Sequence, residues 1–459
     1  MFRNCGSRRH SASLLNRRDF LRIGGLSIGG IGGLGLADVL RLKAAATTSG
    51  TGRSANGTIR SVIMVCLPGG PSHLETYDLK PNAPLDYRGE FRPIPTNVAG
   101  FDICEHMPLQ TRLADKLALV RTVQFVEPMQ HELEEVFTGY PKSEKRPSFG
   151  SVISKFRGTD GTMPAYVSLE YAEGLVSYES PQYLGMAHRP LNIAGNDFVH
   201  NLSIAYGINK TRFDERRALL ETLDGYRRNL DVARGKLTAD PFTNQALDLV
   251  SSGRAREAFD LSREDAKVCE RYGKSDDKFI YVGREASSVW DSQRFLLALR
   301  LAEAGVPVIT LRAGLWDHHG NVVSGAGSTI WSGMKTMLPL MDRSISMLVS
   351  DLHDRGLDKE VAVLVWGEFG RTPRISQNGR DHWPDTSFAL FAGGGLKTGQ
   401  IIGDTDSKGE RPVARPLGPK NVLATVYHLM GIDPEQKVPD FSGRPQYLLD
   451  DGQPISELL

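Results

Sequence analysis

Val361-Ala-Val-Leu-Val-Trp-Gly-Glu-Phe-Gly-Arg-Thr-Pro373 is the stretch of this 459-residue chain that decides its fold. Its first five residues are apolar and mostly β-branched, which predicts a buried strand at 361–365. Glu368 and Arg371 follow that strand directly. Because ligands bind at the carboxyl ends of the strands in open α/β sheets, the sequence predicts a functional site at this end of the strand.

A second polar motif, Asp381-His-Trp-Pro384, follows a short distance along the chain. Glu368, Asp381 and His382 supply the carboxylate and imidazole donors that zinc or manganese prefers, so we expect all three to be metal ligands. The planar guanidinium of Arg371 could pair with an anionic group of a substrate. The alternative for the whole region is a salt-bridged loop with a structural histidine.

A third motif, Trp316-Asp-His-His-Gly-Asn321, follows a predicted strand at 306–312. Two strands would then bring Asp317, His319 and Glu368 to one edge of the sheet. Asp317 and His319 are two residues apart on a tight turn that Gly320 permits, so both could reach one cation, whereas His318 would point elsewhere. A polar surface turn is the alternative.

Strand and helix patterns alternate on both sides of these motifs, which predicts an α/β fold with a mostly parallel central sheet flanked by helices. Short apolar runs predict further strands at 61–67, 117–121 and 388–391. Apolar spacing near 3.6 residues predicts helices at 109–117, 289–304, 334–352 and 419–430. Pro339 should kink the third of these helices or mark a fresh start. The charged region around 211–272 predicts a helical insertion.

Two histidines are further candidates for the site. His73 lies in a glycine-rich segment, residues 68–78, that follows the strand 61–67. His131 follows the predicted strand at 117–121 and could complete the pocket wall. We take both as candidate catalytic residues, with a structural role for the lone His131 as the alternative.

The amino terminus resembles an export signal. Asn16-Arg-Arg-Asp-Phe-Leu-Arg22 is a twin-arginine pattern, followed by an apolar, glycine-rich run at 23–36 and by the small residues Ala44–Ala46. We therefore expect a signal peptide at 1–46, a linker at 47–60, a mature domain at 61–459 and a periplasmic or extracellular location. The apolar run is shorter than the roughly 20 residues of a membrane span, so no stable span should remain after cleavage. An uncleaved anchor is the alternative.

Charge and cysteine content narrow the classes of protein. The segment 1–46 has a net charge of +6 and the whole chain has +1, so the remainder is near −5. No basic surplus is left for a nucleic-acid footprint. Cys66, Cys104 and Cys269 are widely spaced, which does not predict a disulfide framework, although one bridge between two of them is possible.

Five motifs together resemble one family. GGPSHLETYD, WDHHGN, GEFGRTP, GRDHWP and AGGGLKTG occur in this order behind the leader, and the combination resembles the exported bacterial family called domain of unknown function 1501, which is frequent in planctomycetes. That family is placed in the alkaline-phosphatase-like superfamily, beside sulfatases and phosphoglycerate mutases. The resemblance implies a metal-centred hydrolytic site at the carboxyl edge of the sheet.

The functional residues of that superfamily match this chain only in part. Asp317 and His319 resemble one ligand segment, Glu368 takes the place of an Asp-His pair, and His382 resembles the last histidine ligand, with Asp381 beside it. The aspartate that should follow the first strand has no equivalent at Leu67 or Pro68. The segment 128–131, which resembles the nucleophile segment, contains no serine, threonine or cysteine.

These matches imply hydrolysis of a sulfate or phosphate ester with one divalent ion, which could be zinc, manganese or calcium. The substrate would be a small-molecule or glycan ester, attacked directly by water. The alternative is a non-catalytic surface protein that binds an anionic glycan or a partner protein, as the lost ligand and nucleophile would suggest. Neither the substrate nor the oligomeric state follows from the sequence.

Overall fold

The computed structural model describes residues 59–126, 131–159, 162–169, 178–193, 253–281, 284–320 and 329–459. The chain divides into two compact units, Met1–Asn56 and Gly57–Leu459, and all described residues belong to the second. The expected signal peptide and nearly all of the expected linker therefore lie outside the described residues. So does the part of the predicted insertion at 211–252.

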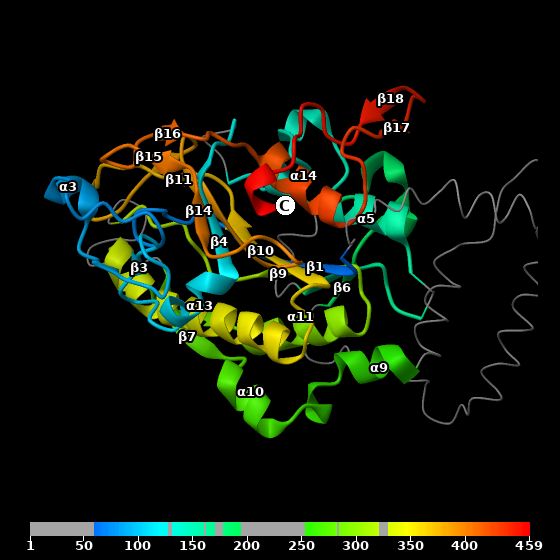
Figure 1. Cartoon of the computed structure of the whole chain (residues 1–459), viewed down its shortest axis with the longest axis horizontal. Coiled ribbons are helices and arrows are strands. Elements are labelled where there is room, and N and C mark those ends of the chain that lie inside the picture. The colour runs from blue at the N-terminus through cyan, green and yellow to red at the C-terminus, as the bar shows by residue number, and fades with distance from the viewer. Residues whose placement is uncertain are drawn as a thin grey trace, which may run out of the picture. The chain divides into compact units, whose positions relative to one another are not determined.

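An eight-stranded sheet forms the centre of the second unit (Figure 1). Its strands follow the order β14-β4-β13-β10-β1-β9-β5-β6. Within this sheet β13 pairs antiparallel with both of its neighbours, and every other pairing is parallel. The bounds are β1 Ser61–Leu67, β4 Leu117–Val123, β5 Tyr166–Leu169, β6 Leu191–Asn192, β9 Val308–Arg312, β10 Val361–Gly367, β13 Ser387–Gly393 and β14 Gln400–Ile402.

The central strand β1 explains why this sheet is buried on both faces. All seven of its residues are buried. Alternate side chains enter two different hydrophobic cores, with Ile63 and Val65 in one and Val62 and Met64 in the other. A strand covered on both faces needs an unbroken apolar run, and this is the pattern that predicted it.

Helices cover both faces of the sheet, which gives three layers (Figure 1). Residues of α11 and α13 pack in the first core, and residues of α4, α5 and α14 pack in the second. The bounds are α3 Leu85–Arg88, α4 Glu134–Thr138, α5 Phe149–Arg157, α9 Gly253–Phe259, α10 Ala266–Tyr272, α11 Gln293–Glu303, α13 Ile330–Asp354 and α14 Pro419–Leu429. The predicted fold class, a mostly parallel sheet flanked by helices, is confirmed.

Five two-stranded sheets complete the described structure. One of them, β11–β12, joins Gly370–Arg371 to His382–Trp383 and belongs to the candidate site. The other strands are β2 Pro93–Ile94, β3 Ile103–Cys104, β7 Asp277–Tyr281, β8 Arg284–Trp290, β15 Asp404–Thr405, β16 Pro412–Ala414, β17 Lys437–Pro439 and β18 Pro445–Tyr447.

One helix prediction was wrong, and one of the two alternatives predicted at Pro339 is excluded. The predicted helix at 109–117 is a pair of short 3-10 turns, Gln110–Arg112 and Ala114–Lys116. The Asp342 carboxylate accepts hydrogen bonds from the first backbone N–H groups there, and the chain enters β4 at residue 117. Pro339 does not start a new helix, since α13 is continuous around it. Thr329 instead begins that helix through a capping box with Ser332.

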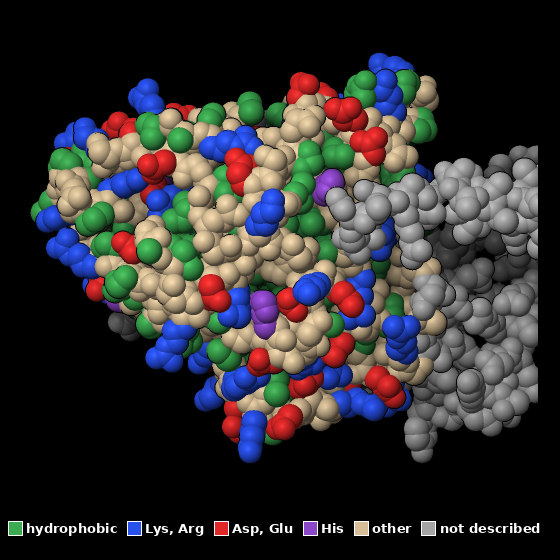
Figure 2. Space-filling model, viewed as in Figure 1, with side chains coloured by type: hydrophobic (Ala, Val, Ile, Leu, Met, Phe, Trp, Pro, Cys, Tyr) green, Lys and Arg blue, Asp and Glu red, His purple; other side chains and the backbone are tan. Residues whose placement is uncertain are grey.

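Other expectations concern the insertion, the cysteines and the surface. In the described part of 211–272, the helices α9 and α10 agree with the predicted helical character. Cys66, Cys104 and Cys269, which all lie in the described part of the chain, form no disulfide bond with one another. Among the described residues, no helix has the length and apolar content to cross a membrane. Figure 2 shows acidic and basic side chains interspersed over the face that it displays.

Candidate metal centre

The strand order brings the predicted motifs together. Because β9 and β10 both lie beside β1, the loops that follow them meet at one edge of the sheet. Asp317 and His319 come from the loop after β9, and Glu368 comes directly after β10. The β11–β12 hairpin then returns the chain, and it pairs Arg371 with His382.

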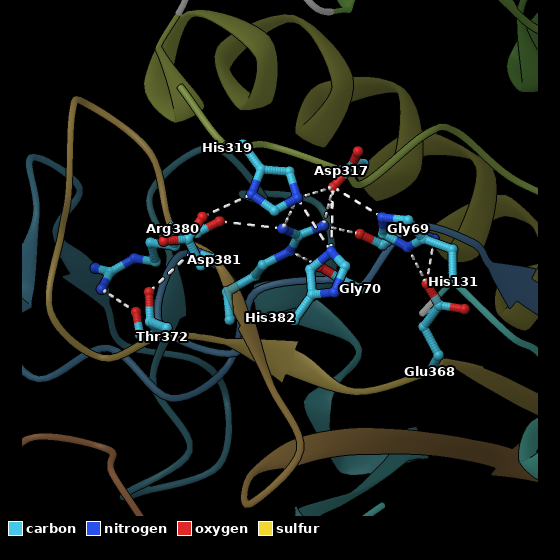
Figure 3. Close-up of polar contacts among 11 residues, drawn as sticks. Gly69, Gly70, His131, Asp317, His319, Glu368, Thr372, Arg380, Asp381 and His382 are labelled. Atoms are coloured by element: carbon cyan, nitrogen blue, oxygen red, sulfur yellow. Dashed lines mark hydrogen bonds and ion pairs between the residues drawn. The ribbon is translucent and has the colours of Figure 1, made fainter. Parts of the chain in front are cut away.

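Four side chains converge on one point (Figure 3). His131, Asp317, His319 and His382 each offer one ligand atom, and these atoms all lie within 4.8 Å of one another. Asp317 Oδ1 lies 2.8 Å from Nε2 of His319, 3.1 Å from Nε2 of His131 and 3.7 Å from Nε2 of His382. Ligands of a tetrahedral ion at 2.0–2.2 Å would lie about 3.3–3.6 Å apart. The three distances from Asp317 Oδ1 lie on either side of this spacing, so small shifts of the side chains would place the four donor atoms around a single divalent ion.

Glu368 and Asp381 take a different position from the one predicted. Neither belongs to the converging group, because each carboxylate contacts the far nitrogen of a histidine ring instead. Glu368 Oε1 lies 2.7 Å from His131 Nδ1, and Asp381 Oδ1 lies 2.7 Å from His319 Nδ1. An ionised carboxylate only accepts hydrogen bonds, so each Nδ1 carries a proton, and each Nε2 would offer a lone pair to a bound ion once it has lost its own proton. Carboxylates commonly hold metal-binding histidines in this way.

The Arg371 side chain is not placed to hold a substrate anion, as the sequence had predicted it would be. Its side chain is fully buried. Nε donates to the carbonyl of Gly70, Nη1 lies within hydrogen-bond distance of the Arg380 carbonyl and of His319 Nε2, and Nη2 contacts the Gly69 carbonyl and Asp317 Oδ1. Four of the five N–H groups therefore have an oxygen acceptor inside the protein, and the fifth faces His319 Nε2, so no pair is left for a two-pronged contact with a substrate. Arg371 acts on the centre through Asp317 and His319.

The groups around Asp317 keep its carboxyl ionised. Burial opposes ionisation of this carboxyl, but hydrogen bonds from three histidines and the nearby Arg371 hold its pKa far below the usual range. Burial lowers the pKa of His131, but hydrogen bonds to Asp317 and Glu368 outweigh it and raise the pKa to about 9. Burial lowers the pKa of His382. Without a metal, Asp317 is thus an anion whose partners are protons on its neighbours.

Gly69 and Gly320 have the backbone geometry that lets the loops approach. Gly69 has φ +103°, and an added Cβ would lie 2.7 Å from the backbone nitrogen of Asp317. Gly320 has φ +68°, and a Cβ there would lie 2.3 Å from the Gln377 carbonyl. The glycine after β1 therefore admits the backbone of the Asp317 loop.

His73 and His318, the other two histidines of the predicted motifs, lie outside the group. His73 is fully buried, and its Nε2 lies 2.9 Å from the Gly409 carbonyl. Burial lowers the pKa of His73. Because its ring is closed off from solvent, we do not carry the predicted catalytic role of His73 further. His318 is also buried and lies against Gly333 of α13, in agreement with the expectation that it points elsewhere.

His131 was predicted as a catalytic or a structural residue, and the structure places it among the four candidate metal ligands. No ligand spacing surrounds it in the sequence. Its position after β4, on the same sheet as β9 and β10, is the signal that favoured it. Its side chain is 38% exposed, more than those of Asp317, His319 and His382.

Fold and site together define an α/β protein with a candidate mononuclear metal centre at the carboxyl edge of its sheet. The model of the family "Protein of unknown function (DUF1501)" matches residues 59–459. The chain belongs to this family, as the five motifs indicated. No curated protein matches the chain in sequence.

Several solved structures are similar to this one over most of its length. The lipoteichoic acid synthase LtaP from Listeria monocytogenes matches with a TM-score of 0.40 and 10% identity, over 89% of this chain and 93% of that one. The phosphonate monoester hydrolase SpPMH from Silicibacter pomeroyi matches with a TM-score of 0.35 and 11% identity, over 87% and 76%. The PsFucS1 sulfatase from Pseudoalteromonas sp. matches with a TM-score of 0.33 and 10% identity, over 91% and 76%.

Proposed function

We propose that this protein is a metal-dependent hydrolase of sulfate or phosphate esters. One observation carries the proposal: the Asp317 carboxylate lies among three imidazole nitrogens, and the rings of His131 and His319 are each held from behind by a carboxylate. Histidines that only stabilise a fold need not all direct Nε2 toward one carboxylate. A cation site does need this arrangement.

The donor set narrows the choice of ion. Three nitrogens and one oxygen suit zinc or manganese, whereas calcium prefers an all-oxygen site. A bound ion of this kind polarises an ester oxygen and lowers the pKa of a water molecule. His131, Asp317, His319 and His382 would hold the ion, which would supply this chemistry if it took a further ligand beside these four.

The protein side chains divide the remaining work. Asp317, His319 and His382 form the partly buried wall of the centre, and His131 closes it on the more exposed side. Glu368 and Asp381 fix the proton on Nδ1 of His131 and His319. Arg371 keeps Asp317 ionised and in place. The segment 128–131 offers no hydroxyl or thiol, so we infer that water attacks the sulfur or phosphorus directly.

The second candidate is a non-catalytic protein that binds an anionic glycan or a partner protein at the cell surface. The contacts of Arg371 favour it, because the guanidinium is buried and donates to four oxygen atoms of the protein, so the expected anion-binding group is not available to a substrate. The two functions differ in turnover and not in metal binding.

An ester panel tests the proposal. We expect the purified protein to hydrolyse 4-nitrophenyl sulfate, 4-nitrophenyl phosphate or bis(4-nitrophenyl) phosphate. Activity should vanish with a chelator and return with zinc or manganese. Asp317→Ala should abolish both turnover and metal binding, while Asp385→Ala, a nearby exposed aspartate, should change neither. Metal binding without turnover of any ester would favour the binding protein.

We also propose that the protein acts outside the cytoplasm, because Asn16–Arg22 has the twin-arginine pattern. Replacing Arg17 and Arg18 by lysine should leave unprocessed precursor in the cytoplasm. Normal processing of that variant would contradict export by this route.

A further inference from the structure

A cavity of about 500 Å³ adjoins the candidate metal centre. Asp381 belongs to both, because its carboxylate contacts His319 and its side chain lines the cavity. That side chain is 60% exposed. The cavity volume lies within the range of roughly 300–1,000 Å³ that is typical of small-molecule sites. Its lining residues are Tyr87, Thr372, Pro373, Arg374, Ile375, Ser376, Asp381, Trp383 and Glu410.

A buried ion pair holds the walls of this cavity. Arg380 is fully buried and pairs with Glu75 at 2.7 Å. The same guanidinium donates to the backbone carbonyls of three lining residues, Tyr87, Thr372 and Pro373. Helix α3 and the loop segment 372–373 are thus tied to one cation, so the cavity is preformed and ligand binding would not require these segments to be ordered first.

The wall that leads to the metal centre is fixed as well. The Asp381 backbone N–H donates to Thr372 Oγ1 at 2.9 Å, and the Thr372 N–H donates to the Asp381 carbonyl at 2.8 Å. Figure 3 shows Thr372 and Arg380 on one side of Asp381 and His319 on the other. A ligand in the cavity would therefore lie beside the residue that positions a metal-binding histidine.

The lining combines aromatic rings with hydrogen-bonding groups. Tyr87 and Trp383 are half-buried, and Trp383 is fixed by a 2.7 Å hydrogen bond from Nε1 to the Glu410 carbonyl. Thr372, Ser376 and Glu410 add polar atoms to the lining. A sugar ring suits such a lining, because its C–H face can pack on an aromatic ring while its hydroxyls exchange hydrogen bonds at the edge.

The charges of the cavity also favour a sugar over an anion alone. Arg374 lines it together with the acidic Asp381 and Glu410, and the Arg374 side chain already pairs with Asp86 at 3.1 Å. Lys408 lies over the Tyr87 ring at 4.8 Å. Positive and negative groups are mixed around the opening of the cavity, so the cavity would not select a ligand by its net charge.

We propose that this cavity binds a sugar ring of the ester substrate, so that the substrate is a sulfated or phosphorylated carbohydrate. This inference rests on the proposed function for the identity of the ester. The binding of the sugar itself rests on the cavity alone and can be measured without a metal.

Calorimetric titration with matched probes tests the proposal. The sugar probes are glucose 6-sulfate, galactose 6-sulfate and N-acetylglucosamine 6-sulfate, and the comparison ligands are 4-nitrophenyl sulfate and inorganic sulfate. Each is titrated into the whole protein, both metal-depleted and zinc-loaded. We expect at least one sugar sulfate to bind ten-fold or more tightly than inorganic sulfate in both forms.

Two substitutions localise the binding. Trp383→Ala removes an aromatic wall, and Ser376→Trp fills the cavity from an exposed position. Each should weaken sugar binding at least ten-fold, and the metal content of each variant, measured beside it, shows whether the neighbouring centre is intact. The second variant keeps the test valid if the first one misfolds.

The outcomes separate this inference from the proposed function. If no sugar sulfate binds better than inorganic sulfate, or if Ser376→Trp binds as the wild type does, the cavity is not a sugar site, whatever the centre hydrolyses. If sugar binding is lost in Ser376→Trp but the protein holds no metal and hydrolyses no ester, the sugar site stands and the proposed hydrolase fails.

Discussion

Asp381→Asn separates a metal ligand from a residue that orients one. Asparagine keeps an oxygen that can accept the hydrogen bond from His319 Nδ1, so the change removes mainly the negative charge behind the ring. The Asp381 side chain is largely exposed, so its replacement should disturb the fold very little.

The size of the effect follows from the position of the carboxylate. Loss of an outer partner of a metal-binding histidine typically costs 10–100-fold in metal affinity, or about 1.4–2.7 kcal/mol. Asp381 is 60% exposed, so solvent screens its charge and we expect the lower end, about ten-fold. The Glu368 side chain is only 2% exposed, so Glu368→Gln should lie near the upper end, about 100-fold.

Competition titration of zinc against a chelator of known affinity measures both effects at one pH. Asp385→Asn, which removes the same charge from an exposed position in the same segment, is the control and should bind zinc as the wild type does. A loss in Asp381→Asn as large as that in Asp317→Ala would make Asp381 a direct ligand and refute the assignment. No loss at all would refute the orienting role.

Two further predictions concern pH and stability. The pKa of His131 is about 9 in the fold, above its ordinary value near 6.5. The protonated ring should therefore stabilise the metal-free protein fully below pH 6.5, and this contribution should be lost as the pH rises through 9. Because zinc competes with that proton, the affinity of the protein for zinc should rise between pH 6.5 and 9. A His131→Gln variant whose stability and zinc affinity change with pH as those of the wild type do would contradict this. Glu75→Gln should destabilise the protein by about 3–5 kcal/mol in urea unfolding, since it leaves the buried Arg380 charge without its partner; a loss below about 1 kcal/mol would show that the pair does not hold the loops.

Much of the sheet could be predicted from the sequence, because buried parallel strands need unbroken apolar runs. The strand 61–67 has the predicted bounds, and β10 begins at the predicted residue. The direction of β13 could not be predicted, since an apolar run such as Phe388–Phe391 is the same for either pairing. The leucines at 109–117 have helical spacing, but their backbone N–H groups find a better partner in Asp342, far along the chain.

The location of the site could be predicted from the sequence, but the role of each residue in it could not. Loops after neighbouring strands must meet, so Asp317, His319 and His382 could be expected near one another. The sequence does not say whether a carboxylate such as Glu368 reaches the centre or stops at a histidine ring, since that depends on differences of a few ångströms. The role of Arg371 depends on the backbone carbonyls of Gly69, Gly70 and Arg380, and these have no signature in side-chain identity.

Anomalous diffraction from crystals soaked in zinc or manganese tests the central claim most directly. A single strong peak should lie about 2.0–2.2 Å from Asp317 Oδ1 and from Nε2 of His319 and His382, with His131 Nε2 as the fourth neighbour and the oxygens of Glu368 and Asp381 beyond bonding distance. No peak at this point, in crystals that bind the same metal elsewhere, would contradict the metal centre and the hydrolase proposed from it.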